Sequence, residues 1–140
     1  MPTSNVEVAH LLRRAGFGGT AAEVAALTPL TRAQLIDRVM DISANPAVVE
    51  PAELASGLEE WQKMDALRRW WFDRMVTTPT PLVERMTLFW SNHFVSSFDK
   101  VYDARAMWDQ VQLYRSLALG SFRTLCHQMA LTVAMLEYLD

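Results

Sequence analysis

The stretch that decides the fold lies between residues 70 and 100 and reads WWFDRMVTTPTPLVERMTLFWSNHFVSSFDK. Pro79 and Pro81 lack the backbone N–H that a helix interior requires, so the helix before them must end near residue 76 or 77. Thr80 can cap a new helix that begins with Pro81, because the first helical position needs no N–H donor. The stretch therefore predicts two aromatic-rich helices joined at a Thr-Pro-Thr-Pro junction.

The helix that begins at Pro81 carries a predicted apolar stripe. Its members are spaced by four, three and four residues: Leu82, Met86, Phe89 and His93. This spacing places them on one side of a helix, with Trp90 beside them and with Glu84 and Asn92 turned elsewhere. We therefore expect His93 to lie at the C-terminal end of a buried or half-buried face.

Capping signals mark three short helices near the N-terminus. A Ser or Thr is followed three residues later by Glu or Gln in three places: Ser4 with Glu7, Thr20 with Glu23, and Thr31 with Gln34. This capping-box pattern predicts helices over residues 5–15, 21–27 and 32–41. The next segment, residues 42–51, contains Asn45-Pro46 and Pro51 and is the possible linker.

The segment from residue 52 to residue 76 has a helical pattern that is weakened at Gly57. Apolar residues recur in it at spacings of three and four: Trp61, Met64, Leu67, Trp71 and Met75. Residues 94–102 show no helix caps and contain Ser96-Ser97, so we predict a loop there.

Two further helices are predicted after this loop. Asp103 can cap the first, and Gly120 suits a left-handed residue at its end. Its expected buried face consists of Met107, Val111, Tyr114 and Ala118. Ser121 begins the second, which carries Phe122, Leu125 and Met129. Because alternation at period two is absent, the sequence predicts an all-α protein, an orthogonal or bundle-like array of about seven to eight helices without a sheet.

Length and composition favour a single domain with an apolar core. We expect no cofactor. The 140 residues are 51% hydrophobic and include five Trp, six Phe and eight Met, which supply enough apolar volume for a core. A net charge of −3 does not provide the basic surface expected of a nucleic-acid binder. Cys126 is the only cysteine, so neither an internal disulfide nor a thiolate metal cluster is expected.

The chain shows no membrane or targeting signal. No apolar run approaches the roughly 18 residues that a membrane-spanning helix needs. The first ten residues lack both the basic and the apolar region of a signal peptide. We therefore expect a soluble chain, cytoplasmic by default.

The motif HLLRRAGFG, residues 10–18, has a structural interpretation and a functional one. In the first, Gly16 takes a left-handed conformation after the helix, Phe17 packs on Leu12, and Arg13 and Arg14 face the negative end of the helix dipole. In the second, Gly18, Gly19 and the start of the helix after Thr20, together with the two arginines, bind an anion.

Several motifs in order resemble the bacterial family known as domain of unknown function 1800. They are HLLRRAGFG, WWFDRM, TPTPLVERMTLFWSNHF, FDKV, ALGSFRTL and AMLEYLD. Members of that family are usually several hundred residues long, so the resemblance implies that residues 1–140 form an N-terminal fragment of a larger helical domain. In the family a second His commonly occupies the position of Ser91. The single imidazole of His93 does not make a coordination set, and no metal site is expected.

One functional hypothesis is a hydrolase-like enzyme to which this chain contributes part of a composite active site. His93 would act as general base or ligand and Asn92 would orient the substrate, with Asp99 or Lys100 at the rim. The alternative is structural, with His93 capping its helix and Trp90 filling the core. The weak candidates for ligand binding are Arg13, Arg14, Trp90, Asp99 and Lys100.

The hypothesis we favour is a helical scaffold or interaction module that is not catalytic on its own. Trp61, Trp70 and Trp71, together with the Met residues, would present an apolar face. The partner would be the missing C-terminal region of a longer family member or another protein. If that face stays uncovered, self-association into a homo-oligomer follows.

Overall fold

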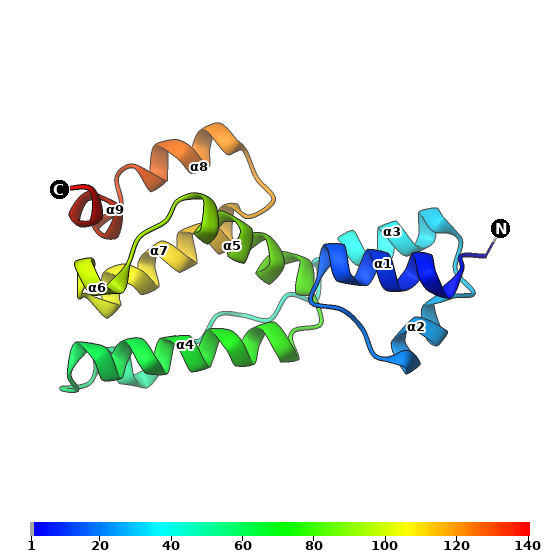
Figure 1. The fold of residues 1–140 in the computed structure, drawn as a ribbon, viewed down its shortest axis with the longest axis horizontal. Coiled ribbons are helices and arrows are strands. Elements are labelled where there is room, and N and C mark those ends of the chain that lie inside the picture. The colour runs from blue at the N-terminus through cyan, green and yellow to red at the C-terminus, as the bar shows by residue number, and fades with distance from the viewer. Residues whose placement is uncertain (1) are drawn as a thin grey trace. The chain divides into compact units, whose positions relative to one another are not determined.

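A computed structural model describes residues 2–140, and its regular elements are helices (Figure 1). Its helices are α1 (Asn5–Ala15), α2 (Ala21–Leu27), α3 (Arg32–Met40), the 3-10 helix η1 (Ala52–Ala55), α4 (Glu60–Thr77), α5 (Pro81–His93), α6 (Phe98–Val101), α7 (Ala104–Leu117), α8 (Phe122–Met129) and α9 (Val133–Leu139). Within residues 2–140 there is no strand, only an isolated bridge between Pro2 and Thr31. The all-α prediction is confirmed.

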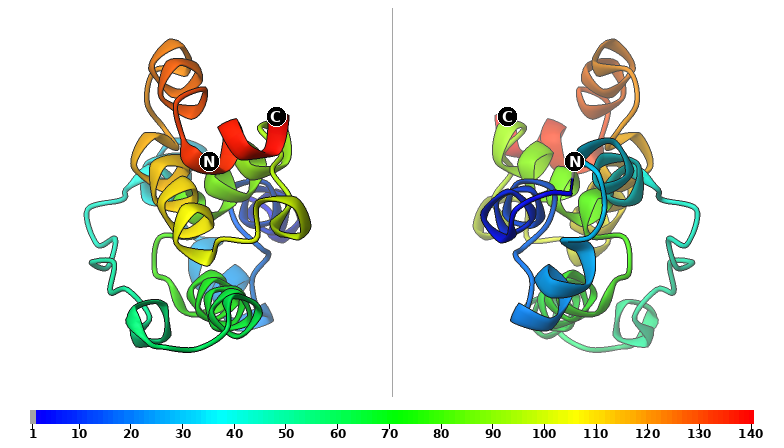
Figure 2. Two further views of the ribbon diagram at one scale, coloured as in Figure 1. Left: turned by 90° about the vertical axis from the view of Figure 1, so that its left-hand side faces the viewer. Right: turned by 90° about the vertical axis from the view of Figure 1, so that its right-hand side faces the viewer.

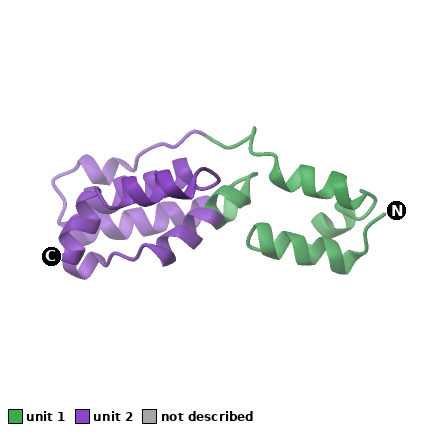
Figure 3. Ribbon diagram, turned by 90° about the horizontal axis from the view of Figure 1, so that it is seen from above, with its two compact units in different colours: residues 1–46, 75–85 green, residues 47–74, 86–140 purple. Residues whose placement is uncertain are grey.

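The chain folds into two compact units (Figure 3). Unit 1 contains residues 1–46 and 75–85, and unit 2 contains residues 47–74 and 86–140. The division after Pro46 falls inside the segment 42–51, in which the structure has no helix or strand. That the chain forms a single domain or an N-terminal fragment of a larger one stays a prediction.

Unit 1 is built on the three predicted capping boxes, all of which are present. In each, the Ser or Thr side chain accepts from the backbone three residues on, and the Glu or Gln side chain accepts from the cap backbone. Helix α1 packs against α2 and α3, with Val8 and Leu35 buried. The predicted start of α5 at Pro81 is also confirmed.

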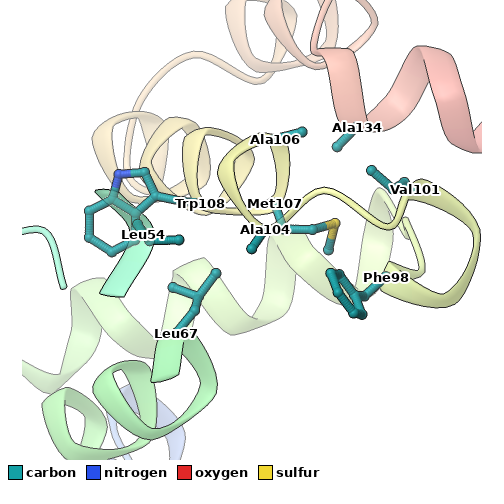
Figure 4. Packing of buried hydrophobic residues seen from close by; sticks show 9 residues of the cluster. All are labelled: Leu54, Leu67, Phe98, Val101, Ala104, Ala106, Met107, Trp108 and Ala134. Carbon is teal, nitrogen blue, oxygen red and sulfur yellow. The ribbon is translucent and has the colours of Figure 1, made fainter. Parts of the chain in front are cut away.

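Helix α7 is the centre of unit 2 and contacts α6, α8 and α9. Asp103 caps it as predicted, and its expected buried face is buried: Met107, Val111, Tyr114 and Ala118. Its first turns join α4, α6 and α9 in one core (Figure 4), formed by Leu54, Leu67, Phe98, Val101, Ala104, Ala106, Met107, Trp108 and Ala134. Trp70 of α4 packs edge-on against Trp108, at 4.8 Å between ring centroids.

The predicted apolar stripe of α5 is wrong at its C-terminal half. Phe89 is 53% exposed and His93 is exposed, whereas Glu84 and Thr87 are fully buried. Neither buried residue is without a partner. Tertiary packing thus selected a face of α5 that contains polar side chains, since a buried polar group is tolerated when it is paired.

The segment 52–76 is two elements rather than one weakened helix. The 3-10 helix η1 ends at Ala55, and α4 begins only at Glu60, so the chain is irregular around Gly57. The predicted stripe of α4 is partly wrong. Leu67 is buried and Met64 packs on the core, but Trp61 is 56% exposed.

Three local predictions also need correction. Residues 94–102 are not only loop: Ser97 caps the short helix α6, and Tyr102 ends it with φ 46°. Gly16 has φ −152°, and among the described residues Gly18, with φ 107°, is the glycine with a positive φ. Gly120 therefore does not take the left-handed conformation, and α7 instead ends in a tight turn in which the Gly120 N–H donates to the Leu117 carbonyl.

The Phe17 ring lies under the Arg85 guanidinium, 5.9 Å from the centroid, and is 43% exposed. That Phe17 packs on Leu12 stays a prediction. The Leu12 carbonyl is used by the backbone, because it accepts from the Gly18 N–H at 3.3 Å. The positive φ at Gly18 lets the chain turn back toward that carbonyl, and glycine adopts such a φ without steric cost.

Candidate functional site

Five ring side chains gather where α5 ends and α8 begins. They form what we call the aromatic cluster: Phe89, Trp90, His93, Phe94 and Phe122. The closest pair across the two helices is Trp90 and Phe122, which stack with centroids 5.6 Å apart. His93 meets Phe94 edge-on at 4.7 Å. Phe89 and Phe122 are each more than half exposed, so the cluster is a surface feature.

Hydrogen bonds to the backbone hold the cluster in place. The Trp90 indole N–H donates to the Ala118 carbonyl at 2.9 Å. The Tyr114 hydroxyl donates to the Phe94 carbonyl, and burial raises the pKa of that phenol, so it stays protonated as a donor. Ser121 caps α8 and so sets Phe122 at the first helical position. The exposed rings are therefore presented on a fixed scaffold.

A groove continues from the cluster between α8 and α9, and sequence reasoning missed it. It has a volume of about 440 Å³ and is lined by Phe94, Cys126, Met129, Ala130, Met135, Leu136, Leu139 and Asp140. Phe94 belongs to both features, so cluster and groove are continuous. We call them together the aromatic groove. A signal in the sequence was the pair of apolar residues Leu136 and Leu139 in the AMLEYLD motif, which the structure leaves 57% and 73% exposed.

The orientation of α9 relative to α8 shapes the groove. After α8, the chain turns and α9 leaves in a different direction (Figure 2). Thr132 lies at that turn, where its hydroxyl caps α9 by accepting from the Met135 N–H and donates to the Met129 carbonyl. Beneath the groove, a second core of Tyr114, Leu125, Met129 and Met135 joins the helices.

The catalytic candidates His93 and Asn92 lie at the last turn of α5. The imidazole of His93 is surrounded by four aromatic rings, those of Phe89, Trp90, Phe94 and Phe122. The Asn92 amide donates to the Leu88 carbonyl of its own helix at 2.9 Å. Across residues 2–140, no group of three or more His, Cys, Asp or Glu side chains is placed to hold a metal ion. The composite active site stays a prediction.

Of the predicted ligand-binding residues, Trp90 lies in the aromatic groove and the other four lie outside it. The Lys100 ammonium donates hydrogen bonds to the carbonyls of Tyr138 and Asp140, at 2.9 and 3.1 Å, and so connects α6 to the end of α9. Asp99 is exposed in the first turn of α6. Arg13 and Arg14 are exposed in the last turn of α1, in unit 1.

The predicted anion site includes the N-terminus of α2, which is already hydrogen-bonded to a carboxylate of the chain itself. The Glu23 carboxylate accepts from the Thr20 backbone N–H at 2.6 Å, at the N-terminus of α2. This hydrogen bond and a second one from the Thr20 hydroxyl lower the pKa of Glu23. The helix terminus that would bind an external anion is thus used by Glu23 itself.

Comparison with known families supports the resemblance seen in the sequence. A family model described as "Protein of unknown function (DUF1800)" matches residues 10–140, which include the aromatic groove. The chain belongs to this family. Comparison of this DUF1800 chain with curated proteins gives no match, and comparison with solved structures gives none.

The DUF1800 chain has no candidate membrane span among its described helices, since none is both long and apolar enough. On α4, Trp61 is 56% and Phe72 is 70% exposed, whereas Trp70 and Trp71 are half-buried. That these tryptophans form a binding face stays a prediction. Further exposed rings and leucines of unit 2 lie on α5, α8 and α9, around the aromatic groove.

Proposed function

We propose that this DUF1800 chain is a helical interaction module that binds an apolar helix in the aromatic groove. The observation that carries the proposal is one continuous apolar surface on α5, α8 and α9, with Phe89, Phe122, Leu136 and Leu139 all more than half exposed. Contiguous apolar patches of this kind mark interaction sites on soluble proteins. The bound helix would belong to another protein or to a further region of a longer family member.

The chemistry of the groove suits an apolar helix. Of its eight lining residues, Asp140 is the charged one, and the exposed large apolar ones are Leu136 and Leu139. Amphipathic helices bind in such grooves through residues at spacings of three and four. Phe89 and Phe122 at one end offer large flat surfaces of the kind that dominate interface energies.

The fixed scaffold of the groove supports binding as well. The Trp90 side chain is held by its bond to the Ala118 carbonyl, and Tyr114 holds the backbone at Phe94, so the Trp90 ring loses little rotamer freedom when a partner binds. Preorganisation of this kind increases affinity, because ordering a mobile side chain costs about 0.5–1.5 kcal/mol.

The test is a competition between an environment-sensitive apolar dye, 1-anilinonaphthalene-8-sulfonate, and a synthetic amphipathic Leu-rich helical peptide. At low micromolar protein, we expect the peptide to displace the dye. We expect Leu139→Asp to reduce both dye and peptide binding about tenfold or more, because a carboxylate in the groove must be desolvated when the groove is filled.

Val6→Asp is the matched control. Val6 is 76% exposed, close to the 73% of Leu139, but it lies on α1 in unit 1. We expect this variant to bind dye and peptide like the parent chain. Equal binding by the Leu139→Asp variant and the parent would show that the aromatic groove is not the binding site.

A further inference from the structure

We infer that the helix bound in the aromatic groove comes from a second copy of this chain, so that two aromatic grooves pair about a twofold axis. This inference rests on the proposed function and names its partner. In a twofold interface each contact occurs twice with the roles exchanged, so a surface can pair with itself only if it is self-complementary. The charges of α8 and α9 meet this condition.

The two helices that flank the groove carry opposite charge. Arg123 and His127 are the ionisable residues of α8 that can be cationic, and both are exposed. Helix α9 carries Glu137, followed by Asp140, and both are exposed. A twofold pairing that sets α8 of one copy against α9 of the other therefore makes two sets of attractive contacts. Pairing α8 with α8 would instead oppose like charges.

These charges are placed at the groove. Arg123 precedes the lining residues Cys126 and Ala130 by three and seven positions, which places all three on one side of α8. Asp140 lines the groove directly, and Glu137 precedes it by three positions, a spacing that places the two acids on the same side of the chain's last helical turn. The Lys100 ammonium is bonded to the main-chain carbonyls of Tyr138 and Asp140, so Glu137 is the better acid for testing the pairing.

The exposed apolar area around the aromatic groove is large enough for a weakly associating dimer. Phe89, Phe122, Leu136 and Leu139 each leave on the order of 100 Å² exposed, and the half-buried members of the aromatic groove add to this. Roughly 600 Å² per copy gives about 1,200 Å² in total, the lower end of stable protein interfaces. We therefore expect a dissociation constant in the micromolar range.

Sedimentation equilibrium of the 140-residue chain tests the inference over about 1 to 500 µM. We expect a monomer–dimer equilibrium in the parent chain and in Val6→Asp. Leu139→Asp should weaken dimerisation tenfold or more. Arg123→Glu and Glu137→Arg should each weaken it several-fold, and the double variant, in which the two charges are exchanged, should restore it to near the parent value.

The exchanged charges should not disturb folding. Arg123→Glu places a negative charge in the first turn of α8, and Glu137→Arg places a positive charge in the last turn of α9, so each new charge suits the helix dipole. Circular dichroism of each variant checks that its helix content is unchanged. A double variant that dimerises no better than the single variants would overturn the inference.

Failure of this inference can be told apart from failure of the proposed function. A parent chain that stays monomeric to 500 µM but still binds the Leu-rich peptide in the aromatic groove overturns only the second-copy partner. A monomeric chain that binds neither the dye nor the peptide overturns both proposals.

Discussion

At the scale of single residues, Glu7 couples the stability of unit 1 to pH. Its carboxylate accepts from the Ser4 backbone N–H at 2.9 Å and pairs with the Arg32 guanidinium. The Ser4 backbone hydrogen bond, followed by the Arg32 contact, lowers the pKa of Glu7 from an ordinary 4.5 to about 2. Because the folded pKa is the lower one, the stabilisation is present above pH 4.5 and is lost as the pH falls toward 2.

Glu7→Gln should therefore reduce the acid sensitivity of the chain. We expect the parent to lose thermal stability between pH 4.5 and pH 2.5 more steeply than the variant, with the difference between the two largest at neutral pH. The measurement is the melting temperature by circular dichroism across that range. Glu53→Gln, at an exposed position in η1, serves as control. Parallel pH profiles for Glu7→Gln and the parent would contradict the assigned role of Glu7.

At the scale of elements, Thr132 connects α8, α9 and α7. Its hydroxyl caps α9, donates to the Met129 carbonyl at the end of α8, and accepts from the Gln110 amide of α7 at 3.4 Å. Gln110 is buried and also accepts from the Ser96 hydroxyl at 2.7 Å. One side chain thus fixes the start of the helix that forms a wall of the aromatic groove.

Thr132→Ala should destabilise the chain by about 1–2 kcal/mol, because a helix cap is lost and the buried Gln110 loses a partner. Urea unfolding measures this change. Thr124→Ala is the control, since Thr124 is exposed on α8 and is expected to change stability by less than about 0.5 kcal/mol. Equal stability of Thr132→Ala and the parent would show that α9 does not depend on this cap.

At the scale of the whole chain, the irregular segment between α3 and η1 is the expected site of first cleavage by proteases. Residues 41–51 contain no helix, and Val49 is 73% exposed. Elastase, which accepts small apolar side chains, should cut here first. The cut fragments should stay together, because unit 1 joins both sides of the cut: Thr80 donates to the Asn45 side chain at 3.0 Å, and Arg85 covers Phe17.

Limited proteolysis followed by mass spectrometry locates the first cut, and native gel filtration shows whether the fragments separate. We expect cleavage near Val48 and Val49 and one nicked species that separates only in denaturant. A variant with Asp at both positions should be cut more slowly, because a charged side chain does not fit the small apolar pocket. A first cut inside α4 or α5 would argue against this description of the chain.

The sequence by itself determined the boundaries of those helices that carry strong local signals. Capping boxes at Ser4, Thr20 and Thr31 and the prolines at the α4–α5 junction act within a few residues, so their effect does not depend on distant parts of the chain. The motifs along the chain also identified the family correctly. Where the signal was weaker, as at Ser97 before the four-residue helix α6, the prediction was wrong.

Only the tertiary structure decided which faces are buried and where the groove lies. In α5 the spacing of apolar residues pointed to Phe89 and His93, but packing buried Glu84 and Thr87 instead. A helical period identifies possible faces, whereas the choice among them depends on which neighbours can pair or cover each side chain. The aromatic groove likewise combines α5, α8 and α9, and their meeting depends on contacts with α7 that no local pattern contains.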